Sequence, residues 1–135
     1  MSGATLRQSR RVDLVRAFEN ASLEAGDFDH EAHILVAWHY VRERGLLDAI
    51  CCFTRGIRRL TQKLGVSARY HETITWFYLI KIAERCRAQP DADWVTFKAA
   101  NPDLFARNPA LVDRYYSRSL LASATARRMF VLPDL

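Results

Sequence analysis

Three histidines and one glutamate are the residues whose types and spacing could do chemistry. His30 and His33 stand three residues apart, and His71 and Glu72 stand side by side where a strongly apolar segment, 69–80, begins. Residues three apart share one face of a helix, so His30 and His33 could bind one metal ion together. His71 could add a third nitrogen, and Glu72 could act as a fourth ligand, an orienting group or a catalytic base. We therefore predict a metal site at the three histidines with Glu72 beside it.

The ligand types indicate which metal such a site would hold. Imidazole suits zinc, copper, iron or nickel, and a carboxylate beside three nitrogens favours zinc or non-haem iron. The expected cofactor is therefore a divalent transition metal: zinc, iron or copper. Three protein ligands that leave one position open describe a catalytic site. The alternative is that the histidines are neutral and buried, each hydrogen-bonded to a carboxylate or a carbonyl, with no metal at all.

Helical spacing dominates the chain and predicts an all-α fold. Apolar residues recur at intervals of three and four, and no segment alternates apolar and polar residues long enough to form a strand. The helices are expected at about 10–23, 29–44, 46–64 and 68–89, with shorter ones near 92–100, 108–116 and 117–128 and an extended tail after them. We predict a compact single-domain bundle of about four main helices plus short C-terminal helices over residues 9–135, after a frayed terminus at 1–8.

Short connections should bring the histidines to one end of this bundle. Asp29 and Ser67 suit the N-cap positions of the second and fourth main helices, and Gly45 and Gly65 suit the ends of the second and third. Helices joined by short connections are antiparallel neighbours. The second and fourth helices therefore point the same way, and their starts, which carry the four site residues, should lie together.

Other residues on the predicted helices have simpler interpretations. His39 is about half a turn out of phase with His30, so it belongs to another face. Tyr40 and Tyr78 follow the same stripes as the site residues and could line a pocket below the site, although plain core is the simpler interpretation of each. Gly56 marks either a weak point of the third helix or a close contact with a neighbour.

Composition and cysteine usage indicate the class of protein. With 135 residues, of which 50% are hydrophobic and 26% charged, the chain is long enough for one domain with its own core. Cys51, Cys52 and Cys86 are odd in number and two are adjacent, which is not a disulfide framework and favours free thiols in a reducing compartment. The N-terminus has no secretory signal, and the most apolar window, 73–80, is too short to span a bilayer. We expect a soluble cytoplasmic protein without a membrane partner.

The distribution of charge is uneven, although the net charge is only +5. Residues 19–31 contain acids but no Lys or Arg, and residues 55–69 contain bases but no acid. The acidic run ends at His30 and His33, and its negative potential would favour a cation at these two residues. The basic run could meet an anionic partner, and a solvated helix face is its simpler interpretation. We expect no nucleic-acid partner, because there is no helix-turn-helix signature and the acidic run would oppose one.

Four runs of residues carry a resemblance to other proteins. They are FDHEAH at 28–33, AWHY at 37–40, YHETIT at 70–75 and FVLPD at 130–134. Together they resemble a group of small uncharacterised bacterial all-helical proteins. The resemblance covers most of the chain after Phe28 and implies no activity. It implies only that the histidine positions belong to a recognisable pattern.

Two hypotheses of function follow from the sequence. In the first, the protein binds a metal at His30, His33 and His71 and could be a metal-dependent enzyme acting on a small-molecule substrate. In the second, it is a non-enzymatic interaction or regulatory module, such as a homodimer, whose histidines are structural. Bound metal would favour the first, and a large apolar contact between chains would favour the second.

Overall fold

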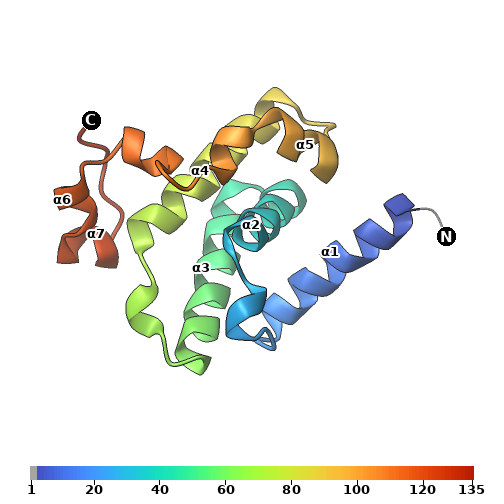
Figure 1. The fold of residues 1–135 in the computed structure, drawn as a ribbon, viewed down its shortest axis with the longest axis horizontal. Coiled ribbons are helices and arrows are strands. Elements are labelled where there is room, and N and C mark those ends of the chain that lie inside the picture. Colours follow the sequence, from blue (N-terminus) through green and yellow to red (C-terminus); the bar gives the residue numbers. More distant parts are fainter. Residues whose placement is uncertain (1–2) are drawn as a thin grey trace.

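The computed structural model describes residues 3–135, with side chains from residue 10 onward, and over this range the predicted all-α fold is confirmed (Figure 1). Within residues 3–135 the regular elements are α-helices and short 3-10 helices, and an isolated bridge joins Arg107 to Ala110. The α-helices are α1 (Gly3–Glu19), α2 (His30–Arg44), α3 (Leu46–Lys63), α4 (Glu72–Ala88), α5 (Trp94–Ala100), α6 (Arg118–Leu121) and α7 (Ala124–Arg128). The 3-10 helices are η1 (Ala25–Asp27), η2 (Ser67–Arg69), η3 (Pro102–Phe105) and η4 (Leu111–Arg114). Within these residues no helix is long and apolar enough to cross a membrane.

Helices α2, α3 and α4 form the centre of the molecule (Figure 1). Helix α2 is buried on most of its circumference, which explains why its sequence from Ile34 to Val41 is almost continuously apolar. Asp29 caps its start by accepting a hydrogen bond from the Ala32 amide at 2.9 Å, as predicted. Gly45, with a φ of 81°, both ends α2 and begins α3. This one-residue link sends α3 back along α2.

Helix α1 is anchored to the centre mainly through its C-terminal end, while its start lies at the edge of the molecule (Figure 1). Phe18 is fully buried and stacks on Phe28 and Phe53 at ring-centroid distances of 5.2 and 5.4 Å. Its ring also fills the space where a side chain at Gly56 would project. Of the two interpretations of Gly56, the close contact is therefore the correct one.

The chain after α5 wraps back onto α4. The guanidinium of Arg85 donates two hydrogen bonds to the carboxylate of Asp103, at 2.9 and 2.8 Å, and so holds η3 against α4. The buried hydroxyl of Thr73 donates to the carbonyl of Ala126 at 2.7 Å and accepts from the amide of Val131 at 3.2 Å. The C-terminal tail is therefore bound to the start of α4.

Several predicted boundaries were wrong for local reasons. Helix α1 starts at Gly3 instead of about Arg10, so residues 3–8, predicted to be frayed, continue it in a stretch free of proline, while residues 1–2 lie outside the described part. Ser67 does not cap α4, because the chain makes the short η2 turn first and His71 takes the N-cap position. The 108–116 segment forms only η4, and the 117–128 segment divides into α6 and α7 because Ser117 and Ser123 each cap a separate short helix.

Candidate functional site

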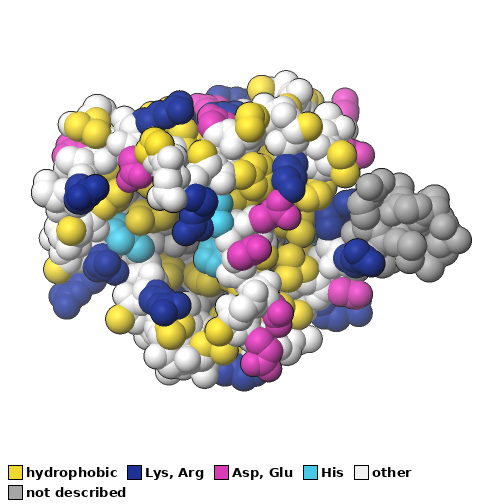
Figure 2. Space-filling model, viewed as in Figure 1, with side chains coloured by type: hydrophobic (Ala, Val, Ile, Leu, Met, Phe, Trp, Pro, Cys, Tyr) yellow, Lys and Arg dark blue, Asp and Glu magenta, His cyan; other side chains and the backbone are white. Residues whose placement is uncertain are grey.

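A chamber of about 570 Å³ lies between the starts of α2 and α4 and one side of α3. His30, His33 and His71 all line it, so the prediction that these helix starts lie together is confirmed. A smaller hollow of about 80 Å³ shares His30 and His33 and continues inward as far as Tyr78. Figure 2 shows histidine side chains next to Lys or Arg side chains on the face that it presents. The lining includes the exposed side chains of Asp29, Arg69 and Arg107 and buried apolar ones such as Phe53 and Leu60, so the chamber has a charged mouth and an apolar interior.

His30 is fastened to a distant part of the chain. Its ring Nε2–H donates to the carbonyl of Leu104 at 2.8 Å, which leaves Nδ1 as an acceptor in the neutral ring. The ring also meets Tyr78 edge-on, with 5.3 Å between centroids. Burial lowers the pKa of His30, and the nearby charge of Arg107 lowers it further, against the raising effects of the Leu104 bond and of Asp29. His30 is therefore neutral at pH 7.

His33 lies deeper, between two aromatic rings. Its imidazole packs on Phe28 at a centroid distance of 4.2 Å and meets the edge of Phe53 at 6.3 Å. Burial lowers the pKa of His33 to about 4, with smaller contributions of the same sign from His30 and Arg107. The ring is neutral at pH 7, so it presents one donor and one acceptor rather than a charge.

Both ring nitrogens of His71 form hydrogen bonds that support the fold. Nδ1 accepts the amide of Ile74 at 3.2 Å and thereby caps α4, and Nε2–H donates to the carbonyl of Leu121 at 2.7 Å. Burial is the largest cause that lowers the pKa of His71. The neutral ring is required, because a proton on Nδ1 would remove the cap. Of the two interpretations made from the sequence, His71 fits the hydrogen-bonded one.

The chamber's histidines do not form a metal centre as they are arranged here. Among the residues that the structure describes, no group of three or more His, Cys, Asp or Glu side chains is positioned to hold a metal ion. For His71 to become a ligand it would have to release either Ile74 or Leu121. The metal site at His30, His33 and His71 therefore stays a prediction that requires rearrangement.

Glu72 is directed away from the chamber. Its carboxylate pairs with Arg58 at 3.3 Å and accepts a hydrogen bond from the hydroxyl of Tyr70. Burial raises the pKa of Tyr70, and the bond to Glu72 raises it further, so Tyr70 stays protonated and serves as the donor. Glu72 does not line the chamber in the described part of the chain, whereas Tyr70 does. The structure thus brings His30, His33 and His71 together at the chamber. It places Glu72 outside the chamber lining, where it is hydrogen-bonded to Tyr70.

Two arginines at the chamber, Arg69 and Arg107, were missed as site residues. Both line it, both are exposed, and neither forms an ion pair with a carboxylate among residues 10–135. Arg107 lines the chamber together with His30 and His33, and its positive charge adds to the effect of burial in lowering the pKa of both rings. Arg69 was visible only as the end of the basic run. No sequence pattern connected Arg107 with the site, because it lies in a loop 74 residues after His33 along the chain.

The two tyrosines predicted to lie below the site differ in position. Tyr78 lines the inner hollow, as expected. Tyr40 packs against Phe18 instead, at 6.2 Å between ring centroids, and belongs to the core. Tyr40 lies on the side of α2 that packs against Phe18 of α1, whereas the ring of Tyr78, on α4, meets His30 at the start of α2.

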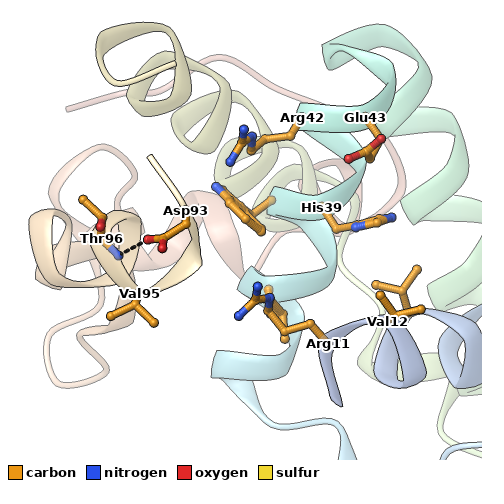
Figure 3. Close-up of a pocket in the computed structure, with 11 residues that line it drawn as sticks. Arg11, Val12, His39, Arg42, Glu43, Asp93, Val95 and Thr96 are labelled. Carbon is orange, nitrogen blue, oxygen red and sulfur yellow. Dashed lines mark hydrogen bonds between the residues drawn. The ribbon is translucent and has the colours of Figure 1, made fainter. Parts of the chain in front are cut away.

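A second hollow, between α1, α2 and α5, contains the fourth histidine, His39 (Figure 3). His39 therefore lies on another face, as predicted. Arg42 in this hollow already donates to the carbonyl of Ala92 and lies over the ring of Trp38. Asp93 is also engaged, because it caps α5 by accepting the amide of Thr96 at 2.9 Å. The histidine chamber, with its two uncommitted arginines, is the better candidate site.

Comparison with known proteins adds no family to this picture. No family model matches the chain, and neither the curated proteins nor the solved structures gave a match. The resemblance of the four runs to small bacterial helical proteins stays a prediction. The function is therefore argued from the chemistry of the chamber.

Proposed function

We propose that the protein binds a small organic anion in the histidine chamber. The apolar body of the ligand lies inside, and its acidic group lies at the mouth near Arg69 and Arg107. The observation that carries this proposal is that Arg107, a cation without an acidic partner among residues 10–135, lines the same chamber as the neutral rings of His30 and His33.

The interior suits an apolar body of moderate size. Its apolar walls come from two neighbouring helices. Helix α3 and the residue that follows it contribute Phe53, Ile57, Leu60 and Leu64, and α4 contributes Ile74. A volume of about 570 Å³ is within the range of pockets that hold small molecules, roughly 300–1,000 Å³. Burial of an aromatic or branched aliphatic group there would supply most of the binding energy.

The mouth suits an acidic group. Guanidinium groups bind carboxylates and phosphates through paired hydrogen bonds, and Arg69 and Arg107 are the two available here. Asp29, the only acidic residue among the described lining residues, is already occupied in capping α2. Neutral His30 and His33 add hydrogen-bonding atoms without the cost of burying a further charge.

The test uses 2-naphthoate as the probe, with neutral 2-naphthamide for comparison. Titration followed by ¹H–¹⁵N NMR should shift the amide signals of Phe53, Ile74 and Arg107, and naphthoate should bind more tightly than naphthamide. Arg107→Gln should weaken naphthoate roughly fivefold to tenfold and leave naphthamide unchanged, since a charge-assisted hydrogen bond is lost. Arg114→Gln is the matched control, because Arg114 is an exposed arginine that does not line the chamber. Equal effects of the two variants, or no shifts in the chamber, would refute the proposal.

A metal-binding function is the second candidate, supported by the three imidazoles that line one chamber. Elemental analysis of protein purified without a histidine tag tests it, with His33→Gln as the variant because His33 neither caps a helix nor holds the C-terminal segment. Near-stoichiometric zinc, iron or copper in the parent and none in the variant would support the metal. No metal in the parent after incubation with each ion would dismiss it.

A further inference from the structure

A basic cleft of about 620 Å³ adjoins the histidine chamber. It runs along α3, η2 and α7 and is lined by Arg58, Thr61, Gln62, Ser67, Ala68, Tyr70, Arg127 and Arg128. Two of these residues, Thr61 and Tyr70, also line the chamber. The two cavities are therefore neighbours that share one wall.

The charge of the basic cleft is not balanced within the described side chains. Arg58 pairs with Glu72 at 3.3 Å and lies over the ring of Tyr70 at 4.9 Å, so one of the three arginines is compensated. Arg127 and Arg128 form no ion pair with a carboxylate among residues 10–135. Two surplus positive charges remain beside the chamber's shared wall, and they would attract an anion.

Arg127 of the cleft is held in place by a hydrogen bond to a distant segment. Arg127 donates from Nη1 to the carbonyl of Ala68 at 3.2 Å, which ties α7 to η2. Its charge contributes to lowering the pKa of His71, so it lies close to the chamber side of the cleft. Thr73 holds the end of α7 through the carbonyl of Ala126. The cleft is therefore assembled by the same C-terminal segment that packs on the start of α4.

We propose that the basic cleft binds a phosphate group on the ligand whose body occupies the histidine chamber. This inference rests on the proposed function and specifies the ligand class: an apolar organic acid that carries a phosphate at a second position. Phosphate has three acceptor oxygens and close to two negative charges at pH 7, which match two arginines and the hydroxyl and amide donors of Ser67 and Gln62. Both cavities are open to solvent and meet along Thr61 and Tyr70, so one molecule that lies across these two residues would reach both.

The experiment compares 6-hydroxy-2-naphthoate with its 6-phosphate ester, so that only the second group differs. The ester should bind the parent protein roughly tenfold more tightly, as expected for added charge-assisted hydrogen bonds. Arg127→Gln and Arg128→Gln should each remove most of that gain without changing the affinity for the hydroxy compound. Arg55→Gln, which removes an exposed arginine of α3 outside both cavities, should leave the gain intact.

Each other outcome overturns the inference and shows which part has failed. Equal affinities for the two compounds, or a gain that survives in Arg127→Gln and Arg128→Gln, would overturn the phosphate site and leave the chamber's proposed function standing. Binding of the ester alone, with NMR shifts confined to the cleft, would overturn the shared ligand and the chamber together. Absence of binding by either compound would refute both proposals.

Discussion

Mild acid should destabilise this protein through His33. The folded protein holds the pKa of His33 at about 4, against 6.5 as its ordinary value, mainly because the ring is buried. As the pH falls, the unfolded chain therefore takes up the proton first, and folding stability decreases. The contribution of His33 is complete above pH 6.5 and is lost between pH 6.5 and about pH 4.

The size of this effect follows from the two pKa values. The difference between 6.5 and about 4, at about 1.36 kcal/mol for each pH unit, gives about 3 kcal/mol, of which about 2 kcal/mol should be lost by pH 5. That is a large fraction of the stability of a small domain, which is about 5–15 kcal/mol. His33→Gln keeps a polar side chain without the titration, so its stability should fall less over the same range.

The assay is urea unfolding followed by far-UV circular dichroism at pH 7, 6 and 5, for the parent and for His33→Gln. Other groups titrate in both proteins, so the difference between their pH dependences isolates His33. His39→Gln is the control for removal of a histidine outside the chamber. An NMR titration of the His33 ring should give a midpoint near pH 4. Equal pH dependences in the parent and His33→Gln, or a midpoint above pH 6, would refute the reasoning.

Three further variants test the packing that builds the chamber. Gly56→Ala should lower the free energy of unfolding by about 1–3 kcal/mol in urea titrations, because the fully buried ring of Phe18 occupies the space of the new methyl group. An unchanged free energy of unfolding would contradict that packing. Thr73→Val should lower the free energy of unfolding by about 1–3 kcal/mol and make the C-terminal segment sensitive to limited proteolysis, since the buried hydroxyl of Thr73 is hydrogen-bonded to that segment. Resistance to proteolysis equal to the parent's would argue against this role. Asp103→Asn should cost about 1 kcal/mol and speed amide exchange in η3, because one of the two hydrogen bonds from Arg85 and the negative charge are lost. Unchanged exchange would show that other contacts hold η3.

Several features of the fold were predictable because they depend on neighbours in the chain. Helical spacing, the Asp29 cap and the Gly45 link act over a few residues, and each is where the sequence placed it. The meeting of His30, His33 and His71 also followed, because short connections leave adjacent helices little choice of direction. The failures at Ser67 and beyond residue 108 came from competing local turns, which periodicity does not resolve.

The chemical state of the site depended on contacts between distant segments. His30 and His71 are held by the carbonyls of Leu104 and Leu121, which are 74 and 50 residues away along the chain. Those bonds use ring nitrogens that spacing alone made available to a metal. Glu72 is likewise directed away from the chamber, where it pairs with Arg58 of the neighbouring helix α3.

The sequence by itself determined the four main helices, their order and the end of the bundle where the histidines gather. The tertiary structure alone decided that the chamber is apolar within, that its histidines are neutral, and that Arg107 faces them from a loop. The physical reason is range. Helix formation and capping depend on residues within one or two turns, whereas burial, pKa and charge partnership depend on whatever the folded chain brings within a few ångströms.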